Sequence, residues 1–348
     1  MATIKDIARE AQVSISTVSF AINGTGPVAP ETKKRIMEVI ERLNYHPSSS
    51  ARGLVTRQSG NICLYVPHPK SNIFTFHDNN LINDMLQGIG ESIDEKNYNL
   101  LLAWEQNEDD DDASKMMSLV HTRAVDGILF FNPTRNYKPI YELIKLKFPF
   151  VFMGSFFDNE PIDTVDIDNF EAGYRNTAHL IKLGHRKIGF VSPGPLHYLL
   201  ADDRFEGYKE ALKDNNIRYN DHYFHIGDNR ETSGVEALDR FLSLKDPPTA
   251  IVAGRDIQAV GIKKRAMACS LIVPGDIAIV SFENSQLAEN HDISSIRTDL
   301  FSIGREASKL LFKMIGRKKE RQTQHIIIPA ELVVRGSCGG KQETSVEE

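Results

Sequence analysis

The sequence predicts a small all-α head and a linking segment, followed by an α/β core of two lobes with parallel sheets. Its 348 residues exceed one compact core, because single cores rarely grow beyond about 250 residues. Three short amphipathic segments fill residues 1–46, and apolar strand-like runs alternate with helical stretches from residue 61 onward. With 41% hydrophobic and 25% charged residues, the chain is neither a disordered polymer nor a collagen-like fibre.

The first helix of the head is predicted by its apolar spacing and its cap. Apolar residues between Ile4 and Ala11 recur on one face, Thr3 is placed as the N-cap, and Asp6 follows three residues later, close to a capping box. A third helix is expected to begin at Pro30, since Pro is favoured at the first helical position. Three such helices can bury one small core.

The second helix carries the most informative surface. Ser14 is placed to cap it, and Asn23-Gly24 ends it. Its outward positions hold Ile15, Ser16, Thr17, Ser19 and Phe20 rather than Lys and Glu. The major groove of DNA accommodates such a helix, because hydroxyls can bond base edges or phosphates and a ring can touch a thymine methyl. The alternative is a helical bundle that contacts another protein.

Charge supports the DNA interpretation. Residues 1–60 hold eight Lys or Arg against five Asp or Glu, a net +3, whereas the rest of the chain holds 33 against 42, a net −9. A basic module on an acidic body favours phosphate contacts, although the asymmetry alone is also compatible with uneven surface charge without function.

Two stretches, TIKDIAREAQVSISTVSFAING and TKKRIMEVIERLNYHPSSSARGL, closely resemble the start of the lactose-repressor (LacI/GalR) family of bacterial transcription regulators. Two positions depart from the family pattern. Gln12 stands where the family often has Gly at the turn, near the left-handed backbone region, and Phe20 stands where His or Arg is more frequent. The resemblance implies DNA contacts from Thr3, Ser14, Ile15, Ser16, Thr17, Ser19, Phe20 and Asn23.

Residues 47–60 form a Pro- and Ser-containing segment that, taken alone, predicts a flexible tether. The resemblance implies more, namely that Ser48 to Val55 folds into a short helix only on operator DNA, because eight residues are too few to be stable alone. Two copies, one from each subunit, would lie in the minor groove. The implied contacts are a close approach at Ala51, an apolar wedge at Leu54, and phosphate contacts from Arg52 and Arg57.

From residue 61 the strand–helix alternation resembles the family's effector-binding core, which has the periplasmic-binding-protein-like fold with a cleft between lobes. We expect the N-terminal lobe to span 61–162 plus about 291–322, and the C-terminal lobe 163–290 plus about 323–336. The tail 337–348 is expected to be disordered.

Polar residues after the strands are the candidate effector ligands, because open α/β sheets bind ligands at the carboxyl ends of their strands. Arg204 matches the family's R-x-x-G position, Arg255-Asp256 its Asn-Asp pair, Glu283 an acid after a strand, and Asp168-Asn169 a pair near the lobe crossover. Alternatively, Asp256 merely caps a helix and Arg204 pairs with a neighbour. The remaining candidates are Asn72, Phe74, Phe76 and Asn229.

Carboxylates that face neutral hydroxyls are typical of sugar sites, which predicts a sugar effector. Two departures weaken this prediction: Arg255 replaces the usual Asn, and Asn229 stands where relatives often place an aromatic ring. The additional Arg favours an anionic ligand, such as a sugar phosphate, as the alternative.

No catalytic pattern emerges, because GxxxxGK[ST], GxGxxG and HExxH are all absent. We interpret the acidic run at 108–112 as the solvated start of a helix and His185 as a structural residue in a turn. We therefore expect no catalytic residue, metal or cofactor. Cys63, Cys269 and Cys338 form no CxxC pair, and neither a membrane span nor a secretory signal is visible, which predicts a cytoplasmic protein with reduced thiols.

The sequence thus predicts a homodimeric transcription regulator, a repressor of carbohydrate-use genes, whose effector closes the cleft and changes the spacing of two heads on palindromic operator DNA. Corepression rather than induction stays open. The rival hypotheses are a kinase-type repressor with a DNA-binding head, an exported binding protein, and a regulator that answers a non-sugar ligand such as a purine.

Overall fold

The structure, a computed structural model, describes residues 2–24, 26–45, 58–67, 79–104, 114–131, 137–154, 161–196, 199–316 and 322–340. Contacts divide the chain into two units, Met1–Asn61 with Leu119–Asp126, and Ile62–Ser118 with Gly127–Glu348. Several predictions fall outside the described residues. They concern Ala51, Arg52, Leu54, Arg57, Asn72, Phe74, Phe76, the acidic run at 108–112 and the part of the predicted tail from 341. The start of that tail was predicted wrongly, because Ser337 and Cys338 are buried in a short 3-10 helix, Gly336–Cys338.

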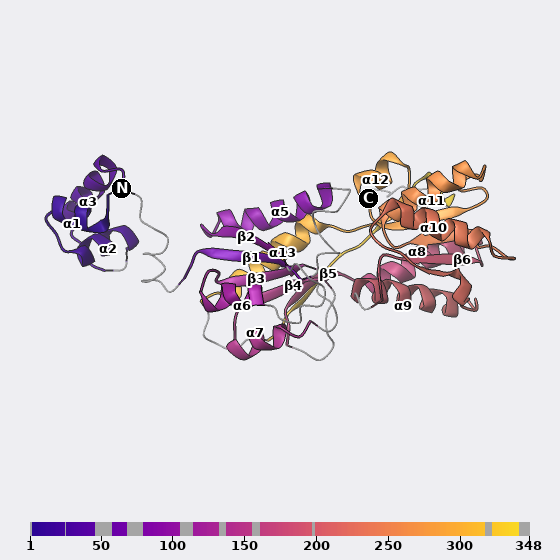
Figure 1. The fold of residues 1–348 in the computed structure, drawn as a ribbon, viewed down its shortest axis with the longest axis horizontal. Helices are drawn as coiled ribbons and strands as arrows, with labels where there is room; N and C mark the ends of the chain where they lie inside the picture. The colour runs from indigo at the N-terminus through magenta and orange to yellow at the C-terminus, as the bar shows by residue number, and fades with distance from the viewer. Residues whose placement is uncertain are drawn as a thin grey trace, which may run out of the picture. The chain divides into compact units, whose positions relative to one another are not determined.

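The head has the three predicted helices, α1 Ile4–Glu10, α2 Ile15–Asn23 and α3 Pro30–Arg42 (Figure 1). The capping box of Thr3 and Asp6 is present, and Ser14 caps α2 by accepting from the Thr17 amide. Gln12 has a φ of 52°, so the turn does use the left-handed region. Apolar side chains from all three helices form the small core predicted from their spacing.

The first lobe is built on a six-stranded sheet in the order β11-β5-β4-β3-β1-β2. Ladders β1–β3, β3–β4, β4–β5 and β5–β11 are parallel, so their carboxyl ends share one edge. Helices α5 and α13 pack closely, since a Cβ on Gly88 would lie 2.0 Å from the Phe301 carbonyl oxygen. The elements are β1 Asn61–Val66, α5 Asn79–Asp94, β2 Asn99–Trp104, α6 Ser114–His121, β3 Gly127–Phe131, α7 Ile140–Leu146, β4 Phe150–Met153, β5 Thr164–Ile167, α13 Leu300–Met314 and β11 His325–Ile328.

The second lobe repeats this plan with the order β12-β10-β9-β8-β6-β7, in which the β12 edge strand runs antiparallel to β10. Its core strands are buried on both faces, as expected for a sheet covered by helices. The elements are α8 Asn169–Lys182, β6 Ile188–Ser192, α9 Leu199–Asp214, η3 Asp221–Tyr223, β7 Phe224–Ile226, α10 Glu231–Leu242, β8 Ala250–Ala253, α11 Asp256–Ala268, β9 Ala278–Glu283, α12 Gln286–Asn290, β10 Ser294–Arg297, β12 Leu332–Val333 and η4 Gly336–Cys338.

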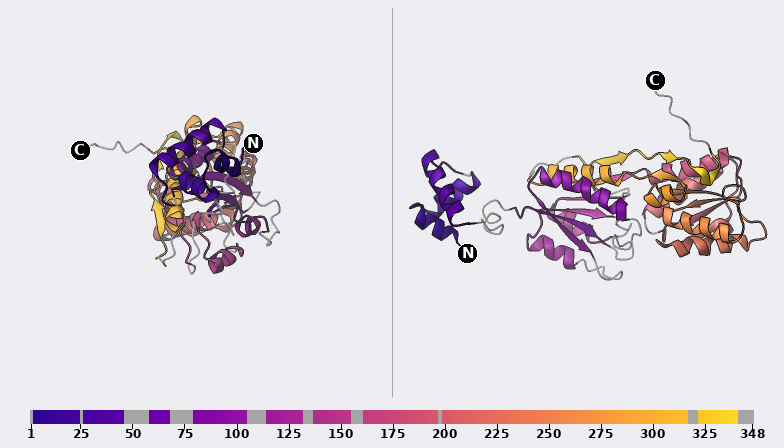
Figure 2. Two further views of the ribbon diagram at one scale, coloured as in Figure 1. Left: turned by 90° about the vertical axis from the view of Figure 1, so that its left-hand side faces the viewer. Right: turned by 90° about the horizontal axis from the view of Figure 1, so that it is seen from above.

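The strands near the lobe crossovers correct the expected boundaries. We expected 291–322 in the N-terminal lobe, but β10 pairs with β9 of the second sheet. We expected 323–336 in the C-terminal lobe, but β11 pairs with β5 of the first sheet, and only β12 closes the second. The chain still passes between the lobes twice in this C-terminal segment, but each crossover comes later than we predicted, after β10 and after β11 (Figure 2). A strand of four residues carries no local signal for its partner, which is why the sequence pattern misplaced both.

Among the residues that the structure describes, no helix is long and apolar enough to cross a membrane.

Candidate effector site and DNA-binding helix

The start of α2 is held by a cluster of hydroxyls. Ser14 Oγ lies 2.7 Å from Ser16 Oγ and 2.8 Å from Thr17 Oγ1, and it accepts from the Thr17 amide at 3.1 Å. The Thr3 hydroxyl is likewise engaged, at 2.7 Å from Asp6 Oδ2. These predicted DNA contacts therefore also shape the ends of the two helices, and each remains exposed or half-buried.

The apolar side chains on α2 are presented to solvent. Ile15 is 46% exposed and Phe20 is 39% exposed. A Cβ on Gly26 would lie 2.8 Å from the Phe20 ring, so the ring rests against the backbone at that glycine and its orientation is restricted. A partly exposed, oriented ring suits contact with a thymine methyl.

A pocket in the core collects polar side chains at the carboxyl ends of strands from both lobes. Arg204, Arg255 and Glu283 come from the second lobe, as the sequence predicted. The first lobe contributes mainly apolar walls. The other lining residues are Ile82, Phe131, Met153, Gly154, Asp166, Ile167, Asn169, Leu200, Thr298, Leu300 and Ile303.

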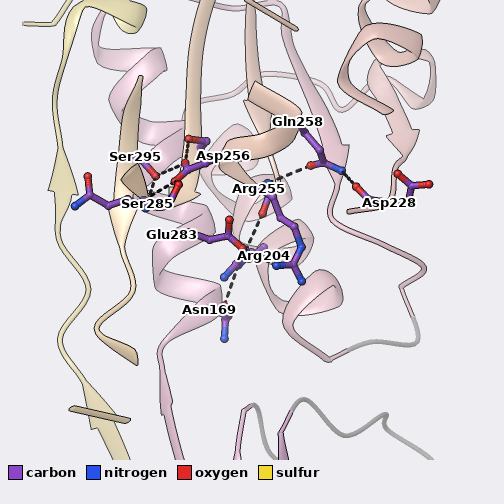
Figure 3. Close-up of polar contacts among 12 residues, drawn as sticks. Asn169, Arg204, Asp228, Arg255, Asp256, Gln258, Glu283, Ser285 and Ser295 are labelled. Atoms are coloured by element: carbon purple, nitrogen blue, oxygen red, sulfur yellow. Dashed lines mark hydrogen bonds and ion pairs between the residues drawn. The ribbon is translucent and has the colours of Figure 1, made fainter. Parts of the chain in front are cut away.

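Arg204 is the most deeply placed cation of this pocket. Its Nε donates to Asn169 Oδ1 at 2.9 Å (Figure 3). Its Nη1 donates to the Gly254 carbonyl at 2.8 Å, and its guanidinium lies 4.2 Å from the centroid of the Phe282 ring. Burial, and then the neighbouring charge of Arg255, lower the pKa of Arg204 to about 10, so it stays a cation at neutral pH. Both of these hydrogen-bond acceptors are neutral oxygens, and among the described residues no carboxylate forms a direct ion pair with Arg204.

Arg255 and Glu283 form a direct ion pair, with Nη1 and Oε1 2.5 Å apart and side chains only 10% and 13% exposed. Glu283 has a φ of 105° and Asn284 a φ of 52°, so the turn after β9 uses backbone conformations that L-residues rarely adopt. Because both side chains are nearly buried, the ion pair lies within the pocket rather than on the surface.

Asp256 lies behind the pocket rather than in its wall. Its Oδ2 accepts from the amide and hydroxyl of Ser285 at 2.7 and 2.8 Å, and its Oδ1 accepts from the hydroxyls of Ser295, at 2.7 Å, and of Ser281 (Figure 3). Burial, and then the charge of Glu283, raise the pKa of Asp256 to about 7. Through these hydrogen bonds the Asp256 carboxyl holds in place the turn at the end of β9, which contains Glu283.

Two other predicted residues are also absent from the pocket wall. Asp168 caps α8, accepting from the Glu171 amide at 2.8 Å. Asn229 follows Asp228, whose carbonyl accepts from Gln258 Nε2 at 2.9 Å. Of the described predictions, the structure thus brings together Arg204, Arg255 and Glu283.

The prediction missed Asp166 and Thr298. Asp166 Oδ2 accepts from Asn169 Nδ2 at 2.8 Å, so a chain of hydrogen bonds runs from Asp166 through Asn169 to Arg204. The Thr298 hydroxyl is buried and has no partner among the described residues. The acids of VDIDN were a visible signal for Asp166, whereas Thr298 had none, because its position depends on the crossover after β10.

Comparisons with known proteins agree with this architecture. Residues 3–48 match the model described as "Bacterial regulatory proteins, lacI family", and residues 177–338 match a "Periplasmic binding protein-like domain". The chain is 32% identical to catabolite control protein A of Priestia megaterium over 318 residues, covering 91% of this chain and 93% of the relative. It is 31% identical to the HTH-type transcriptional repressor PurR of Mannheimia succiniciproducens over 342 residues, covering 97% and 98%.

Solved structures give the same result. A complex of the transcriptional regulator CelR with cellobiose matches with a TM-score of 0.73 at 26% identity, covering 97% of this chain and all of that one. The lac repressor dimer bound to operator and an anti-inducer matches with a TM-score of 0.82 at 22% identity, covering 97% and 99%, which confirms the predicted fold. The chain therefore belongs to the lacI family of bacterial regulatory proteins, and it is a DNA-binding transcriptional regulator.

Proposed function

We propose that the chain is a homodimeric repressor of carbohydrate-use genes, which binds a palindromic operator in the cytoplasm and answers a sugar or sugar-derived effector. It acts by ligand-dependent DNA affinity and not by catalysis. The observation that carries this proposal is the convergence of Arg204, Arg255, Glu283 and Asp166 in one pocket between apolar walls. Charged groups that donate and accept several hydrogen bonds beside an apolar surface suit a polyhydroxylated ring.

The DNA contacts proposed for the head are those of the exposed face of α2. A homodimer would present two such helices, and the two-fold symmetry of the protein would then be mirrored by a palindromic site. The lac repressor relative, a dimer on its operator, supports this arrangement.

The charge of the effector is the finer part of the proposal. The CelR relative is in complex with cellobiose, a neutral sugar, which supports a neutral ligand. The guanidinium of Arg204, which donates to two neutral oxygens, favours a sugar that carries a phosphate or carboxylate. Both kinds of ligand would bind Arg204. A neutral sugar would leave the pair of Arg255 and Glu283 intact, whereas an anionic sugar would compete with Glu283 for Arg255.

Coupling to DNA requires that the effector binds one arrangement of the lobes better than another. Pocket residues lie on elements of both lobes, so a ligand that contacts Asp166 and Arg255 together favours the arrangement in which these residues are close. By linkage, effector and operator must then change each other's affinity by the same factor.

Isothermal titration calorimetry against neutral sugars, their phosphates and sugar acids tests this proposal. The chain has a single tryptophan, Trp104 at the end of β2, whose fluorescence provides a second readout. We expect one sugar class to bind and to change the affinity for a duplex selected by the protein from a random library. Binding of a purine without any sugar, or turnover of ATP in the presence of a sugar, would contradict the proposed effector or the proposed lack of catalysis.

A further inference from the structure

The carboxylate of Asp126 holds the backbone where the chain from the head joins strand β1. Asp126 Oδ1 accepts from the Ser59 amide at 2.8 Å, and Oδ2 accepts from the Gly60 amide at 2.9 Å. The Asp126 amide in turn donates to the Asn61 carbonyl at 2.8 Å. Both oxygens of one carboxylate are therefore engaged by successive backbone donors.

Two further contacts fix this junction. Asn61 Nδ2 donates to the Ala124 carbonyl at 2.9 Å, and the Asn61 backbone amide donates a hydrogen bond to Ser59 Oγ at 3.2 Å. Gly60 has a φ of 72°, a left-handed conformation that brings successive N–H groups round to one anion. We call Ser59, Gly60, Asn61 and Asp126 the junction clamp.

We propose that Asp126 is a positioning residue for operator binding, because the clamp fixes the point and direction at which the chain enters from the DNA-binding head. This inference rests on the proposed binding of an operator by two heads. Charge-assisted hydrogen bonds to backbone amides are the stronger kind, so the carboxylate is well suited to hold this point.

The clamp is also covalently tied to the effector pocket. Asp126 immediately precedes β3, and Phe131 at the far end of β3 lines the pocket. Strand β1 begins at the clamp and runs beside β3, with Ile62 paired to Gly127. A rigid strand of five residues, about 16 Å long, therefore joins the pocket wall to the junction.

Loss of the clamp has a calculable cost. Without the carboxylate, Ser59 and Gly60 gain conformations in the free protein that they must give up when two heads dock on a rigid duplex. The loss of backbone conformational entropy on ordering one or two residues corresponds to roughly a 30-fold loss of affinity for the operator. The carboxylate removes this cost because the junction is ordered before DNA arrives.

A charge effect alone predicts the opposite result. Asp126→Asn removes one negative charge from a protein that binds a polyanion, and by electrostatics this strengthens binding. Glu142→Gln, an exposed position on α7 of the same lobe, removes the same charge without touching the clamp and serves as the matched control. Asp126→Glu keeps the charge and both acceptor oxygens.

The test measures fluorescence anisotropy on a labelled duplex that wild type has selected from a random library. Asp126→Asn is expected to bind about 30-fold more weakly than wild type, Glu142→Gln at least as tightly, and Asp126→Glu within about fivefold. Hydrogen exchange without DNA provides the second readout, and the Ser59 and Gly60 amides should exchange faster in Asp126→Asn only.

A purely structural role would lower the melting temperature and leave the affinity of the folded fraction unchanged. Binding of Asp126→Asn within twofold of Glu142→Gln, or unchanged exchange at Ser59 and Gly60, would overturn the inference while the proposed function stands. Failure of wild type to select any duplex would overturn both. If Asp126→Asn does not fold, Asp126→Glu decides, because full affinity together with faster exchange at these amides excludes a positioning role.

Discussion

Arg255 and Glu283 neutralise each other inside the pocket, at a separation of 2.5 Å between Nη1 and Oε1. The pocket therefore contains an internal counter-ion at a position that the sequence comparison with the family assigned to ligand contacts. A neutral sugar can bind beside this pair and exploit its remaining donors and acceptors. An anionic ligand must compete with Glu283 for Arg255 or be repelled by it.

Glu283→Gln is expected to separate these two cases. The amide keeps one acceptor but frees the charge of Arg255, so a sugar phosphate should bind about tenfold more tightly, corresponding to ~1.4 kcal/mol. A neutral sugar should lose about 1 kcal/mol through the weakened hydrogen bond. Calorimetry with a sugar and its phosphate on wild type and variant measures both, and equal changes for the two ligands would show that Glu283 does not face the ligand charge.

Arg204→Ala should lower effector affinity by about 2–4 kcal/mol and leave operator affinity unchanged. The loss arises because the ligand would no longer receive charge-assisted hydrogen bonds from Arg204, whose guanidinium is positioned by Asn169 and the Gly254 carbonyl. The variant would remain on its operator when effector is added. Arg265→Ala, which removes an exposed ion pair with Asp239 in the same lobe, is the control and should respond normally. Normal effector affinity in Arg204→Ala would place the ligand elsewhere.

The buried carboxyl of Asp256 predicts a specific pH dependence of stability. Its folded pKa of about 7 lies above the ordinary value of 3.8, so the folded state retains a proton that the unfolded state releases between these values. The contribution of Asp256 to stability is thus complete below pH 4 and is lost as the pH rises through 7. Asp256→Asn stays neutral at every pH, and its melting temperature should fall less than that of wild type between pH 5 and pH 8. Parallel melting curves for the two proteins across this range would contradict the assignment.

Operator affinity should depend steeply on salt. Residues 1–60, the head and the linking segment together, carry the basic excess of the chain, and each Lys or Arg that contacts a phosphate releases a counter-ion. A plot of log affinity against log salt should be linear, with a slope equivalent to several phosphate contacts per dimer. Anisotropy titrations between 50 and 200 mM salt, roughly the range over which such contacts lose orders of magnitude in affinity, measure the slope. A flat response would contradict the proposed mode of DNA binding.

The accuracy of the sequence prediction follows the range of the interactions involved. The head was predicted nearly to the residue, because Thr3, Ser14 and Pro30 act on helices that begin within one turn of them. The strands that pair with β10 and β11 were not predicted correctly, because the pairing of a short strand is decided by elements far away in the sequence.

The pocket shows the same division. Glu283 could be found because it follows a predicted strand, and Arg204 because it matches the R-x-x-G position of the family. Asp256 is adjacent to Arg255, yet the start of α11 directs the two side chains to opposite sides. The serines that donate hydrogen bonds to Asp256 come from β9, β10 and the loop after β9. No pattern in the sequence specifies that these hydroxyls meet.

The interleaving of β11 and β12 bears on how the protein is made. Each sheet receives an edge strand from within residues 325–333, so the ribosome must synthesise about 94% of the chain before either lobe has all its strands. The head, whose core uses only residues up to Tyr45, can fold long before that. A nascent chain can thus expose a finished DNA-reading domain while its sensory core is still incomplete, and premature termination upstream of residue 325 would release a head attached to two unfinished sheets.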